Sequence, residues 1–219
     1  MKMASKSTIK VSVVVPNWNG MDSLPACLDS LLAQTQPCRI IVVENGSKDG
    51  SLEFLQTHYP QAELIIHKKN KGFAGGVNGG IQKSIEDGDD YVALFNNDAV
   101  ADEDWLKNLV NDLKVNTDTG IATCKFMSMD KKHLDSTGDL YTRWGLPYPR
   151  GRGEPVSDVY DDFVQVFAAS GGASLYRVSM LEKIGLFDED FFAYYEDVDL
   201  SFRAQLAGWK VRYVPEALA

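Results

Sequence analysis

The sequence predicts an α/β fold with an open, mostly parallel sheet and helices on both faces. Short β-branched apolar runs alternate with segments of helical spacing through the first half of the chain. Such alternation is typical of parallel βαβ crossovers in a doubly wound sheet. With 219 residues, 44% of them hydrophobic, the chain fits one domain with a substantial core.

The expected elements follow in chain order. Strands are expected at 11–15, 39–43, 62–66 and 91–95, with helices after Asp22 or Ser23, over 51–58, from a glycine-rich loop through Ile85, and from near Asp102. After about Ile121 we expect strands at 121–127, 163–168 and 210–214, a loop over 144–155, and helices at 178–184 and from Glu196. No linker or repeat divides the chain, so we expect one domain, 1–219, with halves at about 9–120 and 121–219.

Composition excludes several classes of protein. The net charge is −9 and the chain has no Lys/Arg block, which argues against nucleic acid as a partner. The cysteines, Cys27, Cys38 and Cys124, are scattered and odd in number, as expected for reduced thiols. No apolar run reaches the ~18 residues of a membrane span. We therefore expect a cytoplasmic protein, with peripheral contact at the inner face of the membrane left open.

Polar clusters follow each of the first four expected strands. These are Pro16-Asn17, Glu44-Asn45, Asn70 and Asn96-Asn97-Asp98. In open α/β sheets, ligands bind beyond the carboxyl ends of the strands. The clusters therefore predict a ligand site at that edge of the sheet.

Asp98 is the expected metal ligand of this edge. Mg²⁺ usually takes one or two protein carboxylates and completes its shell with phosphate and water, so one Asp suffices. An Asx turn before the following helix is the alternative. The glycines of 72–80 match neither a dinucleotide fingerprint nor a phosphate loop. They would allow close backbone approach to a ligand, or serve packing alone.

The run Phe192 to Arg203 places three carboxylates within four residues, after an aromatic stretch. Carboxylates this close repel one another unless a metal, an arginine or a proton compensates. Asp199 and Arg203 stand four residues apart and are expected to pair on a helix. Glu196 and Asp197 are then left for other work, although acidic residues also favour the first turn of a helix for its dipole.

Five motifs in order resemble those of inverting family-2 glycosyltransferases of the Rossmann-like GT-A fold, closest to the rhamnosyltransferase-like branch. They are VVVPNWN, VVENGSKDGS, NKGFAGGVNGG, LFNND and FFAYYEDVDLSFR, and the resemblance runs from about Val11 to Ala219. It implies that the domain continues past Ala219, where relatives commonly carry a histidine near the metal. It also implies a nucleotide-sugar-binding half (9–120) and an acceptor-binding, catalytic half (121–219).

The resemblance also implies roles for individual residues. The nucleotide sugar would be bordered by Pro16, Asn17, Trp18, Glu44, Ser47, Asp49, Asn70, Gly72, Phe73, Asn78, Asn96 and Asn97. Asp98 would hold Mg²⁺ or Mn²⁺, with Asn96 where the family has the first Asp of its D-x-D motif. Glu44 would read a pyrimidine base, and Asp197 would be the catalytic base with Glu196 beside it.

The expected function is therefore a hexosyltransferase-type inverting transfer in surface polysaccharide or glycan synthesis. A sugar, rhamnose by the closest resemblance, would pass from a UDP- or dTDP-linked donor to a hydroxyl of a glycan or lipid-linked acceptor. A nucleotidyltransferase would need a Lys- or Arg-rich glycine loop early in the chain, and 16–22 has none. The alternative from another class is a non-catalytic sugar-nucleotide-binding or scaffold domain.

Overall fold

The computed structural model describes residues 9–219, so residues 1–8 of the predicted domain lie outside the described chain. The first half consists of β1 (Val11–Asn17), α1 (Leu24–Leu32), β2 (Arg39–Glu44), α2 (Ser51–His58), β3 (Glu63–Ile66), α3 (Gly72–Glu86), β4 (Tyr91–Phe95) and α4 (Trp105–Val115). The second half consists of β5 (Thr119–Met127), β6 (Leu134–Ser136), β7 (Asp139–Tyr141), β8 (Pro147–Pro149), a 3₁₀ turn (Asp158–Tyr160), β9 (Val164–Val166), β10 (Ala173–Arg177), α5 (Val178–Ile184), α6 (Glu196–Leu206) and β11 (Lys210–Leu218).

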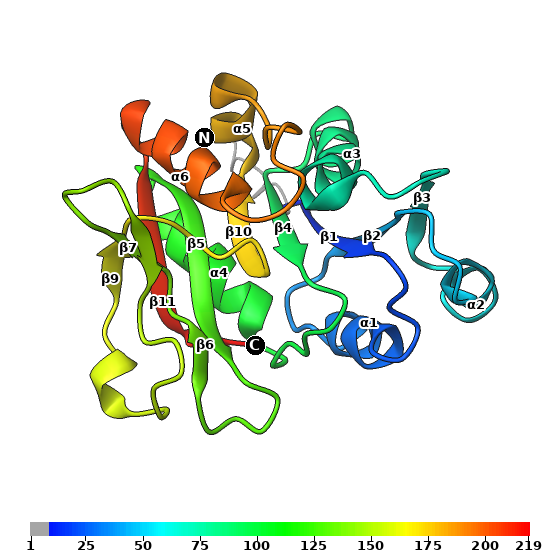
Figure 1. Cartoon of the computed structure of the whole chain (residues 1–219), viewed down its shortest axis with the longest axis horizontal. Helices are drawn as coiled ribbons and strands as arrows, with labels where there is room; N and C mark the ends of the chain where they lie inside the picture. Colours follow the sequence, from blue (N-terminus) through cyan, green and yellow to red (C-terminus); the bar gives the residue numbers. More distant parts are fainter. Residues whose placement is uncertain (1–8) are drawn as a thin grey trace, which may run out of the picture.

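One sheet joins both halves, in the order β3-β2-β1-β4-β10-β5-β11-β9, with β6 paired to β5 (Figure 1). β1 to β4 run parallel, and β11 runs parallel to β5. β10 is antiparallel to both of its neighbours, β4 and β5, so the two parallel groups point the same way. The mostly parallel open sheet and the single domain are therefore as predicted, whereas β10, at the centre of the sheet, was not expected.

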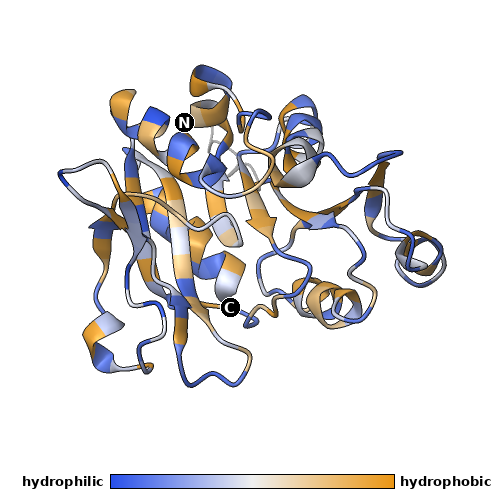
Figure 2. Cartoon of the chain, viewed as in Figure 1, coloured by the Kyte–Doolittle hydropathy of each residue, from blue (hydrophilic) through white to orange (hydrophobic). Residues whose placement is uncertain are grey.

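Helices cover both faces of this sheet, as predicted. Along β1, Val13 and Val15 face the cluster that holds α1, α2 and α4, while Val14 faces the cluster that holds α3, α5 and α6. This alternation follows from the two-residue period of a strand. In Figure 2 hydrophobic residues colour much of the central strands, while helices such as α3 and α6 carry both polar and apolar residues. Among the described residues, no helix is both long and apolar enough to cross a bilayer.

Besides β10, the glycine-rich segment and the expected loop over 144–155 differ from the sequence-based expectation. The glycines of 72–80 do not form a loop but lie within the first turns of α3. A Cβ on Gly80 would lie 2.4 Å from Val14 Cγ1, so this glycine lets α3 pack closely on β1. The expected loop over 144–155 contains β8, which pairs with β7 in a small separate hairpin. Both differences depend on long-range packing, which local periodicity does not report.

Candidate functional site

The carboxyl ends of β1, β2 and β4 are joined by side-chain hydrogen bonds. Asn17 Nδ2 donates to Glu44 Oε2 at 2.6 Å, and Asn97 Nδ2 donates to Asn17 Oδ1 at 2.8 Å. The other Glu44 oxygen accepts the backbone N–H of Ser47 at 2.7 Å. Asn17 is fully buried and Glu44 is 1% exposed, so these bonds satisfy groups that burial would otherwise destabilise.

The loops that follow β1 and β2 are tied to each other in the same way. The backbone N–H of Asn19 donates to Ser47 Oγ, and that of Met21 donates to Asp49 Oδ2, both at 2.9 Å. Trp18 lies between the buried Asn17 and the anchored Asn19, and remains 55% exposed. The loops therefore present an indole ring that is free to stack on a planar ligand.

A third set of contacts joins the glycine-rich helix to the acidic run. Asn45 Nδ2 donates to Asn70 Oδ1 at 3.0 Å, and Asn70 Oδ1 also accepts the backbone N–H of Gly72 at 2.8 Å. A Cβ on Gly72 would lie 2.1 Å from the carbonyl oxygen of Phe192, which accepts the N–H of Phe73 at 2.7 Å. Gly72 is thus required by close backbone approach. We call the whole set the strand-end network: Asn17, Glu44, Asn45, Ser47, Asn70 and Asn97.

Two predicted nucleotide contacts are placed differently by the structure. The Glu44 carboxylate, which was expected to read a base, is enclosed beneath Asn17 with both oxygens engaged in the protein. Asn78 was expected to border the nucleotide, but its amide donates to Phe187 O at 2.8 Å and accepts Phe187 N–H at 3.1 Å. Both side chains are buried and bonded to neighbouring segments, and their contact with the nucleotide stays a prediction.

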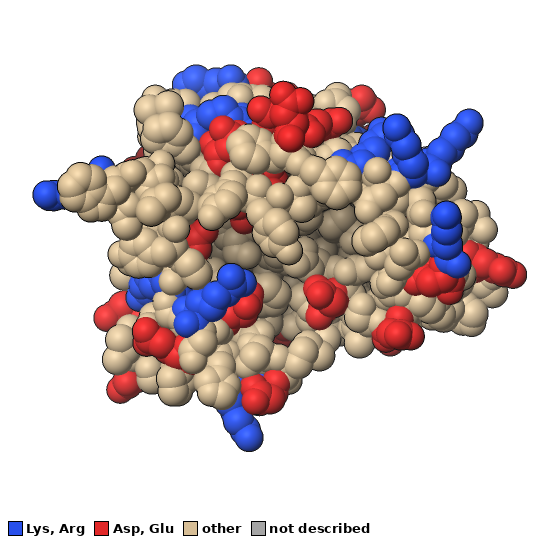
Figure 3. Space-filling view, in the orientation of Figure 1, with Lys and Arg blue, Asp and Glu red and all other residues tan. Residues whose placement is uncertain are grey.

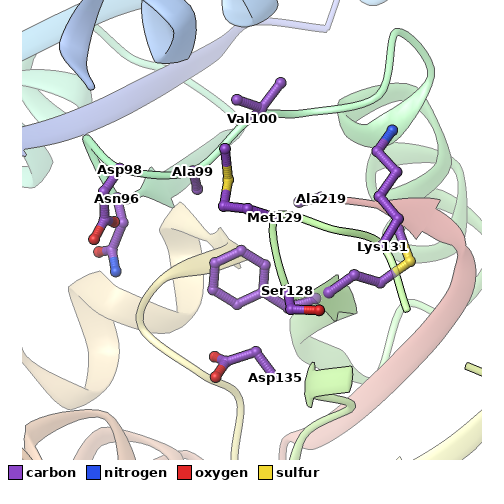
Figure 4. Close-up of a pocket in the computed structure, with 11 residues that line it drawn as sticks. Asn96, Asp98, Ala99, Val100, Ser128, Met129, Lys131, Asp135 and Ala219 are labelled. Carbon is purple, nitrogen blue, oxygen red and sulfur yellow. The ribbon is translucent and has the colours of Figure 1, made fainter. Parts of the chain in front are cut away.

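Two adjoining cavities open beside β4 and share Asn96, Phe126 and Asp135 as wall residues. The smaller, about 380 Å³, is lined by Asp98, Met127, Met129 and Lys131 among others. In Figure 4, the side chains of Asn96 and Asp98 lie together at one end of it, while Lys131 lies at the far side. The larger, about 560 Å³, is walled by the acidic run, the loop at 170–172 and the β7–β8 hairpin.

The predicted site residues divide between these cavities and the strand ends. Those that line a cavity are Phe73, Asn96, Asp98, Glu196 and Asp197. Those that lie outside both are Pro16, Asn17, Trp18, Glu44, Ser47, Asp49, Asn70, Gly72, Asn78 and Asn97. Asn45, which the sequence placed in a strand-end cluster but gave no role of its own, also lies outside both cavities. Its buried side chain and its hydrogen bond to Asn70 identify it as part of the strand-end network.

The residues around Asp98 fit a cation that arrives with a phosphate ligand. Within 9–219, no group of three or more His, Cys, Asp or Glu side chains could hold a metal alone. Asp98 is exposed and faces the smaller cavity. Mg²⁺ binds in this way, through one or two carboxylates plus substrate phosphates and water. Asn96 contributes an amide where a second carboxylate would have added charge.

Asp197 and Glu196 begin α6 at the wall of the larger cavity. The Asp197 oxygens accept the N–H groups of Gly171 and Val198 at 2.9 and 2.8 Å. Burial nevertheless raises the pKa of Asp197. Burial, reinforced by the charge on Asp197, raises the pKa of Glu196 to about 7. Among the described residues, Glu196 Oε2 is buried and has no hydrogen-bond partner.

The remaining carboxylates of this region have separate roles. Asp199 accepts a hydrogen bond from Arg203 at 2.8 Å, which confirms the predicted pair. Asp139, from β7, lines the larger cavity, and burial together with the charge on Asp197 raises its pKa to about 6. No sequence pattern marked Asp139, because it stands alone among irregular residues. We call Asp139, Glu196 and Asp197 the acidic site.

The aromatic run before α6 has an unusual backbone. Tyr194 and Tyr195 adopt positive φ angles of 72° and 69°. For bulky side chains this left-handed conformation is energetically costly, and it tends to persist only where the surroundings impose it. Tyr194 is 82% exposed and both tyrosines line the larger cavity. A strained backbone, exposed aromatic rings and carboxylates with raised pKa values therefore lie at one wall.

Known proteins match this chain over most of its length. Residues 12–185 match the family described as glycosyl transferase family 2. An N-acetylglucosaminyl-diphospho-decaprenol L-rhamnosyltransferase of Mycobacterium tuberculosis is 28% identical over 212 residues, which are 85% of this chain and 67% of that protein. The chain spans 61% of the length of a glycosyltransferase of Bacillus subtilis and 48% of a poly-beta-1,6-N-acetyl-D-glucosamine synthase of Staphylococcus epidermidis.

Solved structures share the fold. A mannosyltransferase of Pyrobaculum calidifontis, solved with GDP-Man and Mn²⁺, superposes with a TM-score of 0.69 at 18% identity, over 97% of this chain and 56% of that one. TarS of S. aureus in complex with UDP gives 0.68 at 16% identity, over 93% and 57%. These likenesses support the GT-A type of the sheet. Because the sequence match extends from β1 to the end of α5, the chain belongs to glycosyl transferase family 2 and is a glycosyltransferase.

Proposed function

We propose that the chain transfers a sugar from a nucleoside-diphosphate donor, held at the ends of β1 to β4, to an acceptor hydroxyl in the larger cavity. The observation that carries this proposal is the adjacency of the two cavities. Asn96 lines both, so the cavity of Asp98 opens beside the cavity of Asp197. The predicted metal ligand and the predicted base thus lie on either side of one wall.

Asp197 acts as the general base in this proposal. An alcohol is a poor nucleophile near neutral pH, so a positioned carboxylate must take its proton during attack on the anomeric carbon. The N–H groups of Gly171 and Val198 fix the direction of the Asp197 oxygens. Attack from the face opposite the diphosphate inverts the anomeric centre. Glu196 and Asp139 hold further acceptor hydroxyls through their oxygens.

Charge must also be stabilised on the leaving diphosphate. Asp98 would hold Mg²⁺ or Mn²⁺, which supplies positive charge to the phosphate oxygens when bound. The amides of Asn96 and Asn97 lie on the same β4 terminus. A neutral Asn96 leaves Asp98 as the single carboxylate of Asn96-Asn97-Asp98, so we propose a cation bound more weakly than by two aspartates.

A pyrimidine donor remains our proposal, by a different contact from the one the sequence predicted. Trp18 offers its exposed ring to the base, while Glu44 fixes Asn17 and the Ser47 loop beneath it. Rhamnose as the sugar is supported by the similarity to the mycobacterial rhamnosyltransferase. Surface polysaccharide synthesis with a glycan or lipid-linked acceptor, by a cytoplasmic enzyme near the inner face of the membrane, completes the proposal.

Binding and turnover together test this function. Calorimetric titration with UDP-, dTDP- and GDP-sugars, with and without Mg²⁺, should show tighter binding of the pyrimidine donors and a Mg²⁺ requirement. Asp98→Ala should weaken donor binding about tenfold in Mg²⁺ and leave metal-free binding unchanged, as expected for loss of one charge-assisted contact. Proton NMR of the product should show an inverted anomeric centre.

The scaffold alternative gives the opposite pattern. Donor binding without any transfer or donor hydrolysis, whatever acceptor is offered, would support a non-catalytic domain. Equal affinity for the donor with and without metal would remove the role assigned to Asp98. Equal affinity for all three nucleotides would remove the pyrimidine preference.

A further inference from the structure

The β7–β8 hairpin extends away from the body of the molecule, at the left of Figure 1. Its turn is closed by ordered hydrogen bonds. Thr142 N–H donates to Leu146 O at 2.9 Å, and Leu146 N–H donates to Thr142 Oγ1 at 3.0 Å. Gly145, with φ +86°, supplies the left-handed residue of such a turn. The tip is therefore held in one shape rather than free to fold back.

The hairpin tip exposes large apolar side chains to solvent. Trp144 is 84% exposed and Leu146 is 65% exposed, and only Gly145 separates them in the chain. Neither side chain is needed for the hydrogen bonds that close the turn. A fixed turn that presents adjoining large apolar residues is typical of a surface that meets a partner.

The hairpin itself, residues 139–149, carries one acidic residue, Asp139 at its base, and one arginine, Arg143 near its tip. From Leu140 to Gly153 there are three arginines and no Asp or Glu, in a chain whose net charge is −9. Two of these arginines are engaged, Arg150 over the ring of Tyr160 and Arg152 with Asp135. Arg143, next to Trp144, is exposed. In Figure 3 the outermost charged side chains of the projecting edge are basic.

We propose that the hairpin tip, defined as Arg143, Trp144 and Leu146, docks on an anionic phospholipid surface. Trp prefers the membrane–water interface, where its ring lies among the headgroups and its N–H stays hydrated. An adjacent arginine is attracted by anionic headgroups, whereas acidic residues would be repelled. The tip thus combines the two kinds of residue that hold a peripheral protein at such a surface.

The same hairpin forms part of the larger cavity. Pro147, Tyr148 and Pro149 of β8 line its wall, only a few residues from the tip. Docking of the tip would therefore hold the cavity mouth close to the lipid surface. This link to a lipid-linked acceptor rests on the proposed function, whereas the docking itself does not.

Vesicle co-sedimentation tests the docking without any donor or acceptor. The whole chain is mixed with vesicles of phosphatidylcholine alone, or with equal parts of phosphatidylglycerol. We expect binding to the anionic vesicles that weakens with added salt. Trp144→Ala with Leu146→Ala should lower the partition coefficient at least about tenfold, because two buried apolar side chains are removed. Arg143→Ala should lower it about fivefold.

Leu32→Ala is the matched control, because Leu32 is also exposed but lies at the end of α1, away from the hairpin. It should bind vesicles like the wild type. Thermal unfolding of each variant, and calorimetric binding of a nucleotide donor, report whether the fold and the donor site are intact.

Three results would overturn the proposal. They are absence of wild-type binding to anionic vesicles, equal binding to neutral vesicles, and unchanged binding of the Trp144/Leu146 double variant. Quenching of Trp fluorescence by brominated lipid gives a second readout, which should fall in Trp144→Phe and persist in Trp18→Phe. Loss of transfer with vesicle binding intact would count against the proposed function alone.

Discussion

The strand-end network and the acidic site differ in how completely their polar side chains are hydrogen-bonded within the protein. In the network, Asn17, Glu44 and Asn70 are bonded to one another or to backbone groups across loops far apart in sequence. In the acidic site, Glu196 carries a buried oxygen without a partner in the described chain, and Asp139 gains no ion pair there. The polar groups of the strand-end network are thus hydrogen-bonded without a ligand, whereas those of the acidic site are not all hydrogen-bonded in the part of the chain that the structure describes.

The difference indicates separate tasks for the two regions. A network already bonded internally holds its loops in a binding-ready arrangement, so less order has to be created on binding. Carboxylates that are buried and close together have raised pKa values, and such groups favour proton transfer near neutral pH. Hydrogen bonds within the protein stabilise the strand-end network, whereas Glu196 of the acidic site keeps a buried oxygen without such a bond in the described chain. Each variant or change of pH considered below perturbs one of these two regions.

The largest expected effect is on catalysis by Asp197. Asp197→Asn keeps the shape of the side chain and removes its proton-accepting charge. Transfer should fall by about 10²–10⁴-fold, the usual contribution of a general base. The donor dissociation constant, measured by calorimetry, should change little, because Asp197 lies in the acidic site rather than at the strand ends.

Asp199→Asn is the matched control for that variant. Asp199 lies on the same helix but pairs with Arg203, so its loss should leave transfer nearly intact. Stability should fall by no more than about 1 kcal/mol, as for a partly exposed ion pair. Retention of over a tenth of wild-type transfer by Asp197→Asn would assign the base elsewhere. A larger loss in Glu196→Gln would point to Glu196.

The second prediction concerns pH. The pKa of Glu196 is raised to about 7 from an ordinary value near 4.5, so the folded state binds this proton more tightly than the unfolded state. Stability should therefore fall as pH rises from about 4.5 to about 7, by roughly 3 kcal/mol for this group. Asp139 and Asp197, whose pKa values are also raised, act in the same direction.

Urea unfolding at a series of pH values measures this loss. In Glu196→Gln the decline should be shallower, since one of the three groups no longer titrates. Transfer by the wild type should also rise with pH, because the base must lose its proton to act and burial raises the pKa of Asp197 above that of an ordinary aspartate. A free energy of unfolding that stays level between pH 5 and 8 would show that ionisation of Glu196 does not destabilise the folded protein.

The third prediction tests the other side of the contrast. Glu44→Gln should weaken the strand-end network by about 1.5–3 kcal/mol, the range for hydrogen bonds to a charged group. Donor binding should weaken with it, although Glu44 is enclosed and touches no ligand in our proposal. Glu44→Asp, which shortens the side chain and keeps the charge, separates charge from reach. Unchanged stability in Glu44→Gln would mean that the loops do not depend on this carboxylate.

The sequence predicted the first half of the molecule better than the second. The strands β1, β2 and β4 are continuous apolar runs, and α2 was predicted with its observed bounds, 51–58. Their side chains face a core on both sides, so composition alone marks them. The strand-end clusters could likewise be placed at one edge, because parallel strands end at the same edge of a sheet.

In the second half α5 was also predicted with its observed bounds, 178–184, but other parts depend on contacts that no local pattern reports. β10 is a short strand, 173–177, and it is strand only because β4 and β5 flank it. Asp139 reaches the acidic site because its backbone bonds to Ala168, far along the chain. Glu44 was expected to contact a base, and in the structure its carboxylate is bonded to Asn17 of the protein itself.

The smallest expected effect concerns the strained backbone before α6. Tyr194→Gly should relieve the left-handed conformation and stabilise the fold by about 0.5–1 kcal/mol, once the greater freedom of glycine in the unfolded chain is subtracted. Transfer should fall severalfold, because a freer backbone no longer holds the start of α6 in one position. Ala193→Gly is the matched control. Ala193 is exposed in the same run without a positive φ, so glycine there should destabilise by about 0.5–1 kcal/mol. If urea unfolding shows that Tyr194→Gly loses as much stability as Ala193→Gly, the tyrosine backbone holds no strain, and the acidic site owes its position to packing alone.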